Sequence, residues 1–229
     1  KYLNQYRYLS QKYSSGNHDE HTAIRNFQKH FHLPVSGELD DATISLMKQP
    51  RCGVPDGDDE GSLQKRYSTY IAWNKYSLKY YIINYSRDLD RGTQDTIFKK
   101  AFQLWADKSS LKFSLANSVK NADIKISFGT GFHGKCAVAF DGVGNVLAHA
   151  FYPENGDIHF DEDETFTDKI ESGINLLSVA VHEIGHALGL EHTNVKDAVM
   201  YPLSKKPATD VKLHRDDIAG IQSLYGGNV

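Results

Sequence analysis

Three histidines within a short run constrain this chain most, because their spacing can bring three imidazoles to one point. His182 and His186 are four residues apart, so on a helix they project from the same face and can grip one ion. Gly189 can adopt a positive φ angle, which would end the helix in a sharp turn and fold His192 back toward that ion. The run therefore predicts a zinc site with three protein ligands and one open position.

The residue after the first histidine suggests what this site does. Glu183 lies beside the open position, where it can act as general base for a water molecule whose pKa the zinc lowers to about 7. A bare His-Glu-x-x-His pattern also occurs in ordinary helices with surface histidines, but the added glycine and third histidine argue against that. The segment Ala198–Pro202 with Met200 resembles the tight methionine turn that zinc proteases of the metzincin type have beneath their metal, and a methionine that merely fills the core is the alternative.

A cysteine between two prolines predicts that the site is blocked in this chain. Cys52 lies in the segment Pro50–Asp56, which the prolines make stiff and extended. A thiolate is a strong zinc ligand, and attachment to the same chain raises its effective concentration, so Cys52 can take the place of the water. Arg51 and Asp56 have opposite charges and can pair to hold the loop. The alternative is a disulfide between Cys52 and Cys136, the only other cysteine.

Taken together, these motifs resemble a matrix metalloproteinase in its proenzyme form, over nearly the whole chain. The other matching strings are Phe27–Asp40, Leu147–Ala150, His159–Glu164 and Asp216–Gln222. The resemblance implies a secreted, extracellular zinc endopeptidase, held latent by Cys52, that cleaves proteins of the extracellular matrix, with collagen degradation as one outcome. It also implies an activating protease and protein inhibitors of metalloproteinases as partners.

Two other functions compete with this interpretation. The first is a non-catalytic metzincin-like binding module, against which the intact Glu183 argues. The second is a metzincin of another branch with a different restraint, against which the segment Pro50–Asp56 argues.

Composition excludes several other classes of protein. With 229 residues and 40% hydrophobic content, the chain can bury a substantial core. Its formal net charge of −3 gives no indication of binding to nucleic acid or to an anionic membrane. No apolar run approaches the about 20 residues that a transmembrane helix needs.

The pattern along the chain predicts an α+β fold in two parts. Residues 1–49 predict a small three-helix propeptide domain, with one helix near residues 2–9, one at His21–Phe31 and one from a cap at Asp40 to Met47. The rest of the chain predicts strands at Leu78–Asn84, Leu111–Leu115 and Ala122–Phe128. It predicts helices at Thr93–Lys108, Asn175–Leu188 and Asp216–Tyr225. This order is typical of a sheet with helices against it, and the resemblance implies a metzincin catalytic domain with a twisted, mostly parallel sheet.

The boundary between the two parts is expected in a linker. An acidic, glycine-rich stretch precedes the dibasic pair Lys65–Arg66, and such a pair in an exposed linker suits a trypsin-like or furin-like protease. An ordinary pair of surface residues is the alternative. We expect a propeptide with its cysteine segment and linker at residues 1–66, a catalytic domain at 67–229, and a cut between Arg66 and Tyr67.

A second, structural zinc is implied by the resemblance at His133, His149 and His159, which lie among glycines and acids as loop-held ligands do. In the family an aspartate two residues after the first histidine is the fourth ligand, but here that position is Lys135, whose protonated amine cannot bind zinc. We expect the neighbouring Cys136 to replace it. The alternative is a buried free thiol beside an empty site or beside one that a water completes.

Family positions further imply two calcium sites, with the oxygen ligands that calcium prefers. The first consists of the carboxylates of Asp141, Asp161 and Glu164 with the carbonyls of Gly142, Gly144 and Val146. The second consists of Asp123, Asp157 and the carbonyl of Asn155, in a loop that is shorter than the family usually has. Without an ion, these residues would form only a solvated acidic loop.

The resemblance places an extended substrate along Leu147–Ala150, where it adds a strand and is recognised through its main chain. The carbonyl of Ala148 is expected to accept a hydrogen bond from the leaving amine. Sequence preference must then come from a pocket between the helix near Ser178 and the turn at Tyr201 and Pro202. Ser178 is small, which predicts a deep pocket that accepts bulky apolar side chains.

Overall fold

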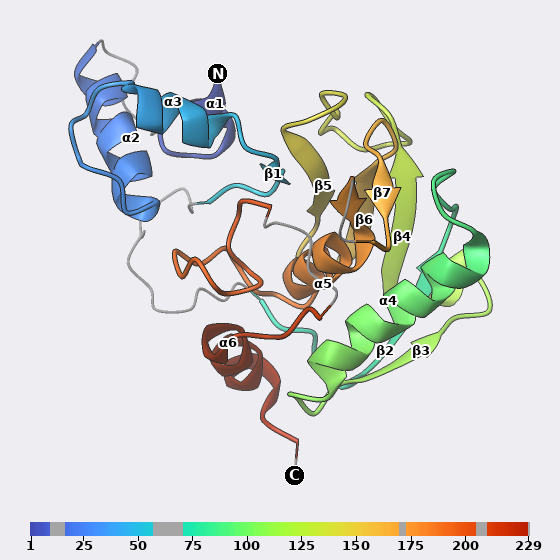
Figure 1. Cartoon of the computed structure of the whole chain (residues 1–229). Coiled ribbons are helices and arrows are strands. Elements are labelled where there is room, and N and C mark those ends of the chain that lie inside the picture. Colours follow the sequence, from blue (N-terminus) through green and yellow to red (C-terminus); the bar gives the residue numbers. More distant parts are fainter. Residues whose placement is uncertain (10–16, 57–70, 170–172, 205–209, 229) are drawn as a thin grey trace.

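The computed structural model describes residues 1–9, 17–56, 71–169, 173–204 and 210–228 (Figure 1). It confirms the expected α+β class, because three helices near the N-terminus precede a mostly parallel sheet with helices packed against it. The predicted cut between Arg66 and Tyr67 lies outside the described residues.

The N-terminal part consists of α1 (Tyr2–Gln5), α2 (Asn17–His30) and α3 (Asp41–Met47). Asp40 caps α3 as its sequence predicts, because its carboxylate accepts a hydrogen bond of 2.8 Å from the backbone nitrogen of Thr43. That bond satisfies one of the amides that the first helical turn leaves without a partner.

Helix α1 is shorter than the spacing of its apolar residues predicts. It ends at Gln5, and Arg7 has a φ angle of 60°, which reverses the direction of the chain. The backbone nitrogen of Tyr8 then donates to the carbonyl of Leu3 at 2.8 Å. The reversal buries both Tyr6 and Tyr8, which a continuous helix would place on different faces.

An aromatic core holds the N-terminal part together and continues into the rest of the molecule. The buried residues that form it are Tyr6, Tyr8, Ala23, Phe27, Phe31, Tyr201 and Leu203. The rings of Phe31 and Tyr201 lie 5.7 Å apart and nearly perpendicular, an arrangement that aromatic pairs favour. Because Tyr201 and Leu203 come from the far end of the chain, the N-terminal core is complete only when both parts are in contact.

The main sheet has six strands in the order β1-β5-β6-β4-β2-β3. Their bounds are β1 Arg51–Cys52, β2 Ser77–Ile82, β3 Lys112–Leu115, β4 Ile124–Gly129, β5 Val146–Ala150 and β6 Asp157–Asp161. All neighbouring pairs are parallel except β5 and β6. A separate small sheet pairs β7 (Phe166–Thr167) with β8 (Ile174–Asn175).

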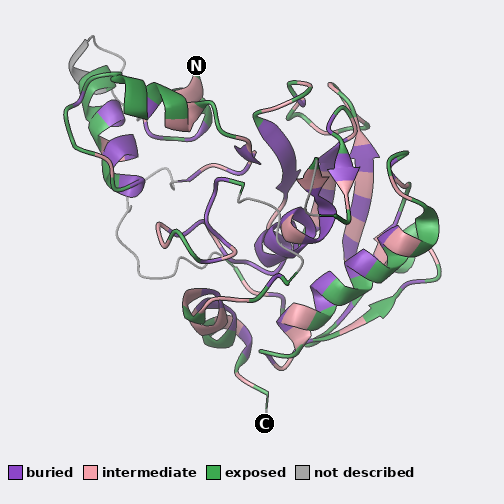
Figure 2. Ribbon diagram, in the orientation of Figure 1, coloured by how far each residue is buried: buried purple, intermediate pink, exposed green. Residues whose placement is uncertain are grey.

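Strand β5 is buried along its whole length (Figure 2). Helix α5 packs against β5. The outer edge of β5 is paired with β1, the strand that carries Cys52. A sheet edge that would otherwise offer free backbone groups is therefore occupied by the N-terminal part of the chain.

The part of the molecule that follows β1 is completed by α4 (Arg91–Ala106), α5 (Leu176–Ala187), α6 (Arg215–Tyr225) and a short 3-10 turn, η1 (Val119–Asn121). Asn175 begins α5, because its side chain accepts a hydrogen bond of 2.9 Å from the backbone nitrogen of Ser178.

The main core lies between the sheet, α4 and α5. Trp105 of α4 is fully buried, and its Nε1 donates to the carbonyl of Val181 at 2.9 Å, so it fixes α4 against α5. In the described ranges, no helix is long and apolar enough to cross a membrane.

Candidate active site

The three histidines of the run meet at one point, as their spacing predicts. His182 and His186 lie one turn apart on α5, and Gly189, with a φ angle of 100°, reverses the chain so that His192 returns to them. Each pair of their Nε2 atoms lies 3.1 Å apart. Nitrogens that bind a tetrahedral zinc at about 2.0–2.1 Å lie about 3.3 Å from one another, so the three imidazoles fit such an ion.

The outer nitrogens of the two helical histidines point to backbone oxygens. Nδ1 of His182 lies 2.7 Å from the carbonyl of Val199, and Nδ1 of His186 lies 2.7 Å from the carbonyl of Leu190. An acceptor at Nδ1 places the proton there, which leaves the lone pair of Nε2 free for a metal. Burial lowers the pKa of His186 well below its usual range, so this ring is neutral and suited to bind a cation.

Met200 lies beneath the site, as the sequence predicts. A Cβ atom added to Gly185 on α5 would collide with the side chain of Met200, so helix and turn are in close contact. The backbone nitrogens of Val199 and Met200 donate to the Asp217 carboxylate of α6 at 2.8 and 3.0 Å. Asp217 thus holds the turn in place, a role that the sequence analysis did not identify.

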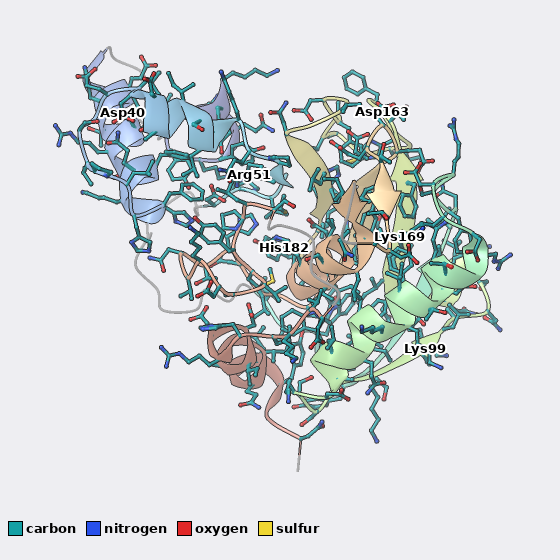
Figure 3. The ribbon with its side chains drawn as sticks, in the orientation of Figure 1. Asp40, Arg51, Lys99, Asp163, Lys169 and His182 are labelled. Carbon is teal, nitrogen blue, oxygen red and sulfur yellow. The ribbon has the colours of Figure 1, made fainter. Side chains whose placement is uncertain are left out.

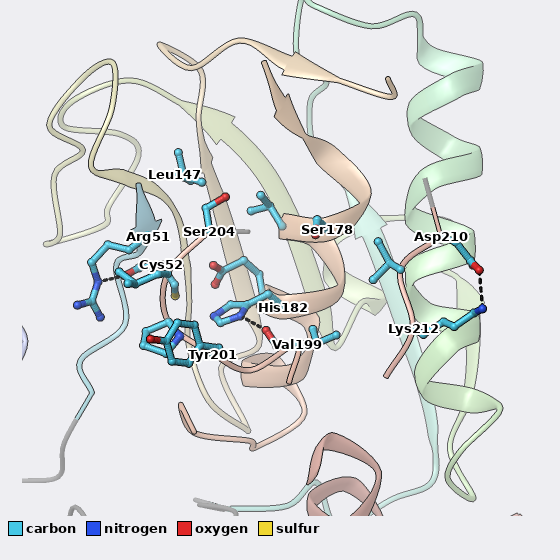
Figure 4. Close-up of a pocket in the computed structure, with 15 residues that line it drawn as sticks. Arg51, Cys52, Leu147, Ser178, His182, Val199, Tyr201, Ser204, Asp210 and Lys212 are labelled. Atoms are coloured by element: carbon cyan, nitrogen blue, oxygen red, sulfur yellow. Dashed lines mark hydrogen bonds and ion pairs between the residues drawn. The ribbon is translucent and has the colours of Figure 1, made fainter. Parts of the chain in front are cut away.

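The sulfur of Cys52 completes a set of four ligand atoms. The ligand atoms of Cys52, His182, His186 and His192 all lie within 4.8 Å of one another, and all four residues are buried. Figure 4 shows two of them, Cys52 and His182, side by side. The backbone fixes this position, because Cys52 donates its N–H to the carbonyl of Pro202 at 3.0 Å and Gly53 donates to that of Ala148 at 2.8 Å. Both cysteines are free thiols, which rules out the alternative of a disulfide between Cys52 and Cys136.

Arg51 and Asp56 form a fully buried ion pair next to Cys52. The Nη2 atom of Arg51 lies 2.5 Å from Oδ1 of Asp56, and neither side chain is more than 1% exposed. The guanidinium also stacks on Tyr6, with its carbon 3.5 Å from the ring centroid, and donates to the hydroxyl of Tyr2 at 2.8 Å. Although burial alone would raise it, Arg51 and His192 hold the pKa of Asp56 well below its usual range.

This pair connects the N-terminal helices to the histidine cluster. Figure 3 shows Arg51 between those helices and His182. Asp56 accepts a hydrogen bond of 2.6 Å from the hydroxyl of Tyr8, and its other oxygen lies 2.8 Å from Nδ1 of His192. The sequence indicated the pairing of Arg51 with Asp56 but neither the tyrosines nor the contact with His192.

Glu183 has the surroundings of a general base. It is buried, and among the described residues neither carboxylate oxygen accepts a hydrogen bond of regular geometry. Burial raises the pKa of Glu183 to about 8, and the nearby Cys52 thiol lowers it only in part. Such a pKa suits proton transfer near neutral pH, and an orphaned buried carboxylate is what a site for water or a cation would leave.

A cavity opens beside the four ligands, between α5 and the turn after it (Figure 4). Its walls include Leu147, Ser178, Val179, Val199, Tyr201 and Pro202. The predicted pocket residues therefore lie together, and the small side chain of Ser178 leaves space within the cavity. Ala148 lies on β5 beside the cavity, where Gly53 now occupies its carbonyl.

A second cluster brings together His133, Cys136, His149 and His159, whose ligand atoms also lie within 4.8 Å of one another. The Cys136 sulfur is 3.3 Å from Nε2 of His149, and Nδ1 of His159 lies 3.0 Å from His133 and 3.1 Å from His149. Burial lowers the pKa of His149 to about 3 and that of His159 to about 4, so both rings are neutral. Cys136 itself is half-buried, unlike Cys52.

The carboxylates of the first predicted calcium site are neighbours. Burial raises the pKa values of Asp161 and Glu164, and Asp141 adds to both shifts. Glu164 accepts a hydrogen bond of 2.6 Å from the Gly144 nitrogen, and Asp141 accepts one of 3.2 Å from that of Val146. Within the described part of the chain, however, these three acids do not form a set of ligand atoms as compact as the two histidine clusters.

Lysines contact the carboxylates of the second predicted calcium site. Asp123 lies 2.5 Å from Nζ of Lys75, and Asp157 lies 2.8 Å from Nζ of Lys125. The Asn155 side chain accepts from the Asp157 nitrogen at 3.0 Å. A cation at this position would have to compete with two ammonium groups, which the sequence pattern did not indicate.

Comparison with known proteins assigns each part of the chain to a family model. A model described as Matrixin matches residues 72–226, and one described as a putative peptidoglycan binding domain matches residues 1–47.

Three relatives illustrate the likeness. Human matrix metalloproteinase-19 is 42% identical over 229 residues, which are 98% of this chain and 44% of the relative. The hatching enzyme of Paracentrotus lividus is 42% identical over 90% of this chain and 34% of its own length. Mouse stromelysin-1 is 45% identical over 89% of this chain and 42% of its own length. The chain thus spans less than half the length of each of these relatives.

Proposed function

Because the chain belongs to the matrixin family, we propose that it is the latent form of a secreted zinc endopeptidase, restrained by its own Cys52. The observation that carries the proposal is the convergence of one buried sulfur and three buried imidazole nitrogens beside a buried carboxylate. Three neutral ligands with a fourth, removable one are what a latent hydrolytic metal site requires.

His182, His186 and His192 would hold the ion. When bound, zinc acts as a Lewis acid that activates a water molecule and polarises the scissile carbonyl. Backbone carbonyls fix two of the three rings through their Nδ1 atoms, so the ligand geometry exists before substrate arrives.

Glu183 moves the proton in the reaction. Its carboxylate takes a proton from the attacking water and delivers it to the leaving amine, a transfer that a pKa near neutrality favours. The Ala148 carbonyl then accepts a hydrogen bond from that amine. Positioning of Glu183 on α5, directly after His182, keeps the base at a constant distance from the ion.

The substrate adds a strand to the edge of β5. The latent chain gives this proposal a physical basis, since β1 already uses that edge and Gly53 already donates to the Ala148 carbonyl. The cavity beside Ser178 would accept a bulky apolar side chain of the substrate. The propeptide therefore blocks the enzyme twice, because its sulfur occupies the metal position and its backbone occupies the substrate edge.

Activation is proposed to follow a cut between Arg66 and Tyr67, which separates a propeptide at residues 1–66 from a catalytic domain at 67–229. An external protease makes the cut, and protein inhibitors of metalloproteinases then control the enzyme. Its substrates are proposed to be proteins of the extracellular matrix. The support for these statements is family membership and the dibasic pair in the sequence.

A second metal is proposed at His133, His149 and His159, with Cys136 as the fourth ligand. The half-buried thiol and two neutral rings fit a zinc ion, whose thiolate ligands lie at about 2.3 Å. Calcium is proposed at Asp141, Asp161 and Glu164 with the carbonyls of Gly142, Gly144 and Val146, since it would relieve the repulsion between the buried carboxylates of Asp161 and Glu164 and the exposed one of Asp141. The site at Asp123, Asn155 and Asp157 has weaker support, because lysines contact both acids.

Hydrolysis of a quenched fluorescent peptide by the intact chain tests the proposal. We expect no hydrolysis at first, and rapid hydrolysis after limited trypsin or after an organomercurial that captures the Cys52 thiol. A chelator should abolish that activity, and Glu183→Gln should lower it by about 10²–10⁴-fold while zinc stays bound.

Each contrary result has a defined meaning. A cleaved chain that binds zinc but does not hydrolyse peptides would be a binding module rather than an enzyme. Hydrolysis by the untreated, uncut chain would contradict the restraint by Cys52.

A further inference from the structure

The outer nitrogens of the three clustered histidines have partners in different parts of the chain. His182 and His186 face backbone carbonyls of the catalytic part. His192 instead has Nδ1 2.8 Å from Oδ1 of Asp56, which belongs to the N-terminal part; the contact is close, although its geometry is not that of a regular hydrogen bond.

Asp56 is held firmly enough to orient another side chain. Its carboxylate is completely buried, with Arg51 at one oxygen and the hydroxyl of Tyr8 at the other, 2.6 Å away. Its backbone nitrogen donates to the carbonyl of Tyr6 at 3.3 Å. Two tyrosines from the first residues of the chain therefore fix a carboxylate that faces a histidine near the other end of the molecule.

The partner at the outer nitrogen of a metal-binding histidine influences the metal. It fixes the orientation of the ring and raises the basicity of the inner nitrogen, and its loss typically lowers metal affinity by about 10–100-fold. A carboxylate does this more strongly than a neutral carbonyl, because its charge stabilises the N–H of an imidazole bound to a cation. Of the three ring partners described above, only the Asp56 side chain is charged.

We propose that Asp56 is a positioning residue for His192, through which the propeptide holds the zinc site at a second point besides Cys52. The sulfur acts inside the coordination sphere, and the carboxylate acts outside it on one ligand. The latent chain should accordingly retain zinc more tightly than the sulfur alone explains, and activation should weaken retention through His192 in particular. This inference rests on the proposed function, since it takes the three histidines as zinc ligands.

Nuclear magnetic resonance of the imidazole N–H groups tests the inference directly. The sample is the full zinc-loaded chain with ¹⁵N-labelled histidine, in a Glu183→Gln background that prevents self-cleavage. With Asp56→Asn, we expect the His192 Nδ1–H resonance to shift and its proton to exchange faster with solvent, while those of His182 and His186 stay unchanged. Zinc should pass to a competing chelator about tenfold faster.

Tyr8→Phe is the matched control. It removes the hydroxyl at the other oxygen of Asp56 but leaves the carboxylate beside His192, so the His192 resonance should shift much less than in Asp56→Asn. A second measurement needs no substitution at Asp56. After the linker is cut and the propeptide removed, the His192 N–H should exchange fastest, because the carbonyl partners of the other two rings remain.

Three outcomes would overturn the inference. The His192 resonance could stay in place in Asp56→Asn, or all three resonances could move together as Cys52 becomes reactive, which would mean that the propeptide had simply opened. In the cleaved chain, the three N–H groups could exchange at equal rates. A wild-type chain that binds no zinc at these histidines would overturn the proposed function and this inference with it.

Discussion

Acidification should loosen the propeptide through His30, a residue in the last turn of α2. Its side chain is 6% exposed and packs against the rings of Phe31 and Tyr8, with centroids 4.9 and 6.0 Å away. Among the described residues, no partner forms a hydrogen bond with its buried Nε2. Burial lowers the pKa of His30 to about 4, and the opposing attraction of Asp56 does not compensate for it.

The sign of the effect follows from proton uptake. When the N-terminal part opens so that His30 enters water, its pKa is 6.5, so between pH 6.5 and 4 this open state binds more protons than the docked one. Docking therefore keeps its full strength above pH 6.5 and weakens as the pH falls toward 4. The loss should be about 2 kcal/mol at pH 5, or about 30-fold in the population of the open state, and about 3 kcal/mol below pH 4.

Alkylation of Cys52 by iodoacetamide, followed by mass spectrometry, reports how often the propeptide opens. The comparison is between the full chain and His30→Leu, both in a Glu183→Gln background. The ratio of their rates at each pH cancels the titration of the thiol and of the metal ligands. From pH 7.5 to 5, we expect the wild-type rate to rise about 30-fold more than that of the variant. Parallel profiles would refute the reasoning.

Three further predictions concern the latch, the helix and the second cluster. Arg51→Ala leaves Asp56 buried without its cation, which should weaken docking by about 3–5 kcal/mol and give peptide hydrolysis without any protease; a variant as latent as the wild type would contradict this. Gly185→Ala forces a Cβ atom against Met200, so it should lower the free energy of unfolding by about 1–3 kcal/mol. Urea denaturation measures this change, and an unchanged midpoint of the unfolding transition would count against the contact. Cys136→Ser should lose one bound zinc by elemental analysis while Cys136→Asp keeps it, and equal metal content in all three chains would exclude the sulfur as a ligand.

Much of the candidate site could be predicted because its determinants are local. The spacing of His182 and His186 on one helix face and the reversal at Gly189 depend on a few neighbouring residues, and the structure places them as expected. The cap of α3 at Asp40 was likewise predicted from its side chain, whereas the sequence analysis gave Asn175 only as the start of the helix that it caps.

Contacts between distant segments could not be predicted from the sequence. The buried pair of Arg51 and Asp56 was expected, but its contacts with Tyr2, Tyr6 and Tyr8 were not. Tyr8 reaches Asp56 after the chain reversal at Arg7, which has a positive φ angle that no local sequence pattern indicates. Strand β1 has only two residues, and its pairing with β5 depends on the docking of the whole N-terminal part.

The metal sites outside the catalytic cluster show the same limit. Cys136 could be suggested as a metal ligand because it lies next to Lys135, which stands where the family has an aspartate ligand. Its sulfur does reach the histidine cluster. The ammonium groups beside Asp123 and Asp157 come from lysines on other segments, so the acidic pattern alone gave no sign of them. The residue types predicted which groups could bind a cation. Only the fold determined which lysine ammonium groups would compete with a cation for them.

The position of the Cys52 sulfur relative to the ion decides the central claim. Anomalous diffraction at the zinc absorption edge, from crystals of the intact chain, measures it directly. The account predicts a zinc peak among His182, His186 and His192, with the Cys52 sulfur about 2.3 Å from it. A zinc ion at these histidines with Cys52 turned away from it, in a chain that is nonetheless inactive, would contradict the account.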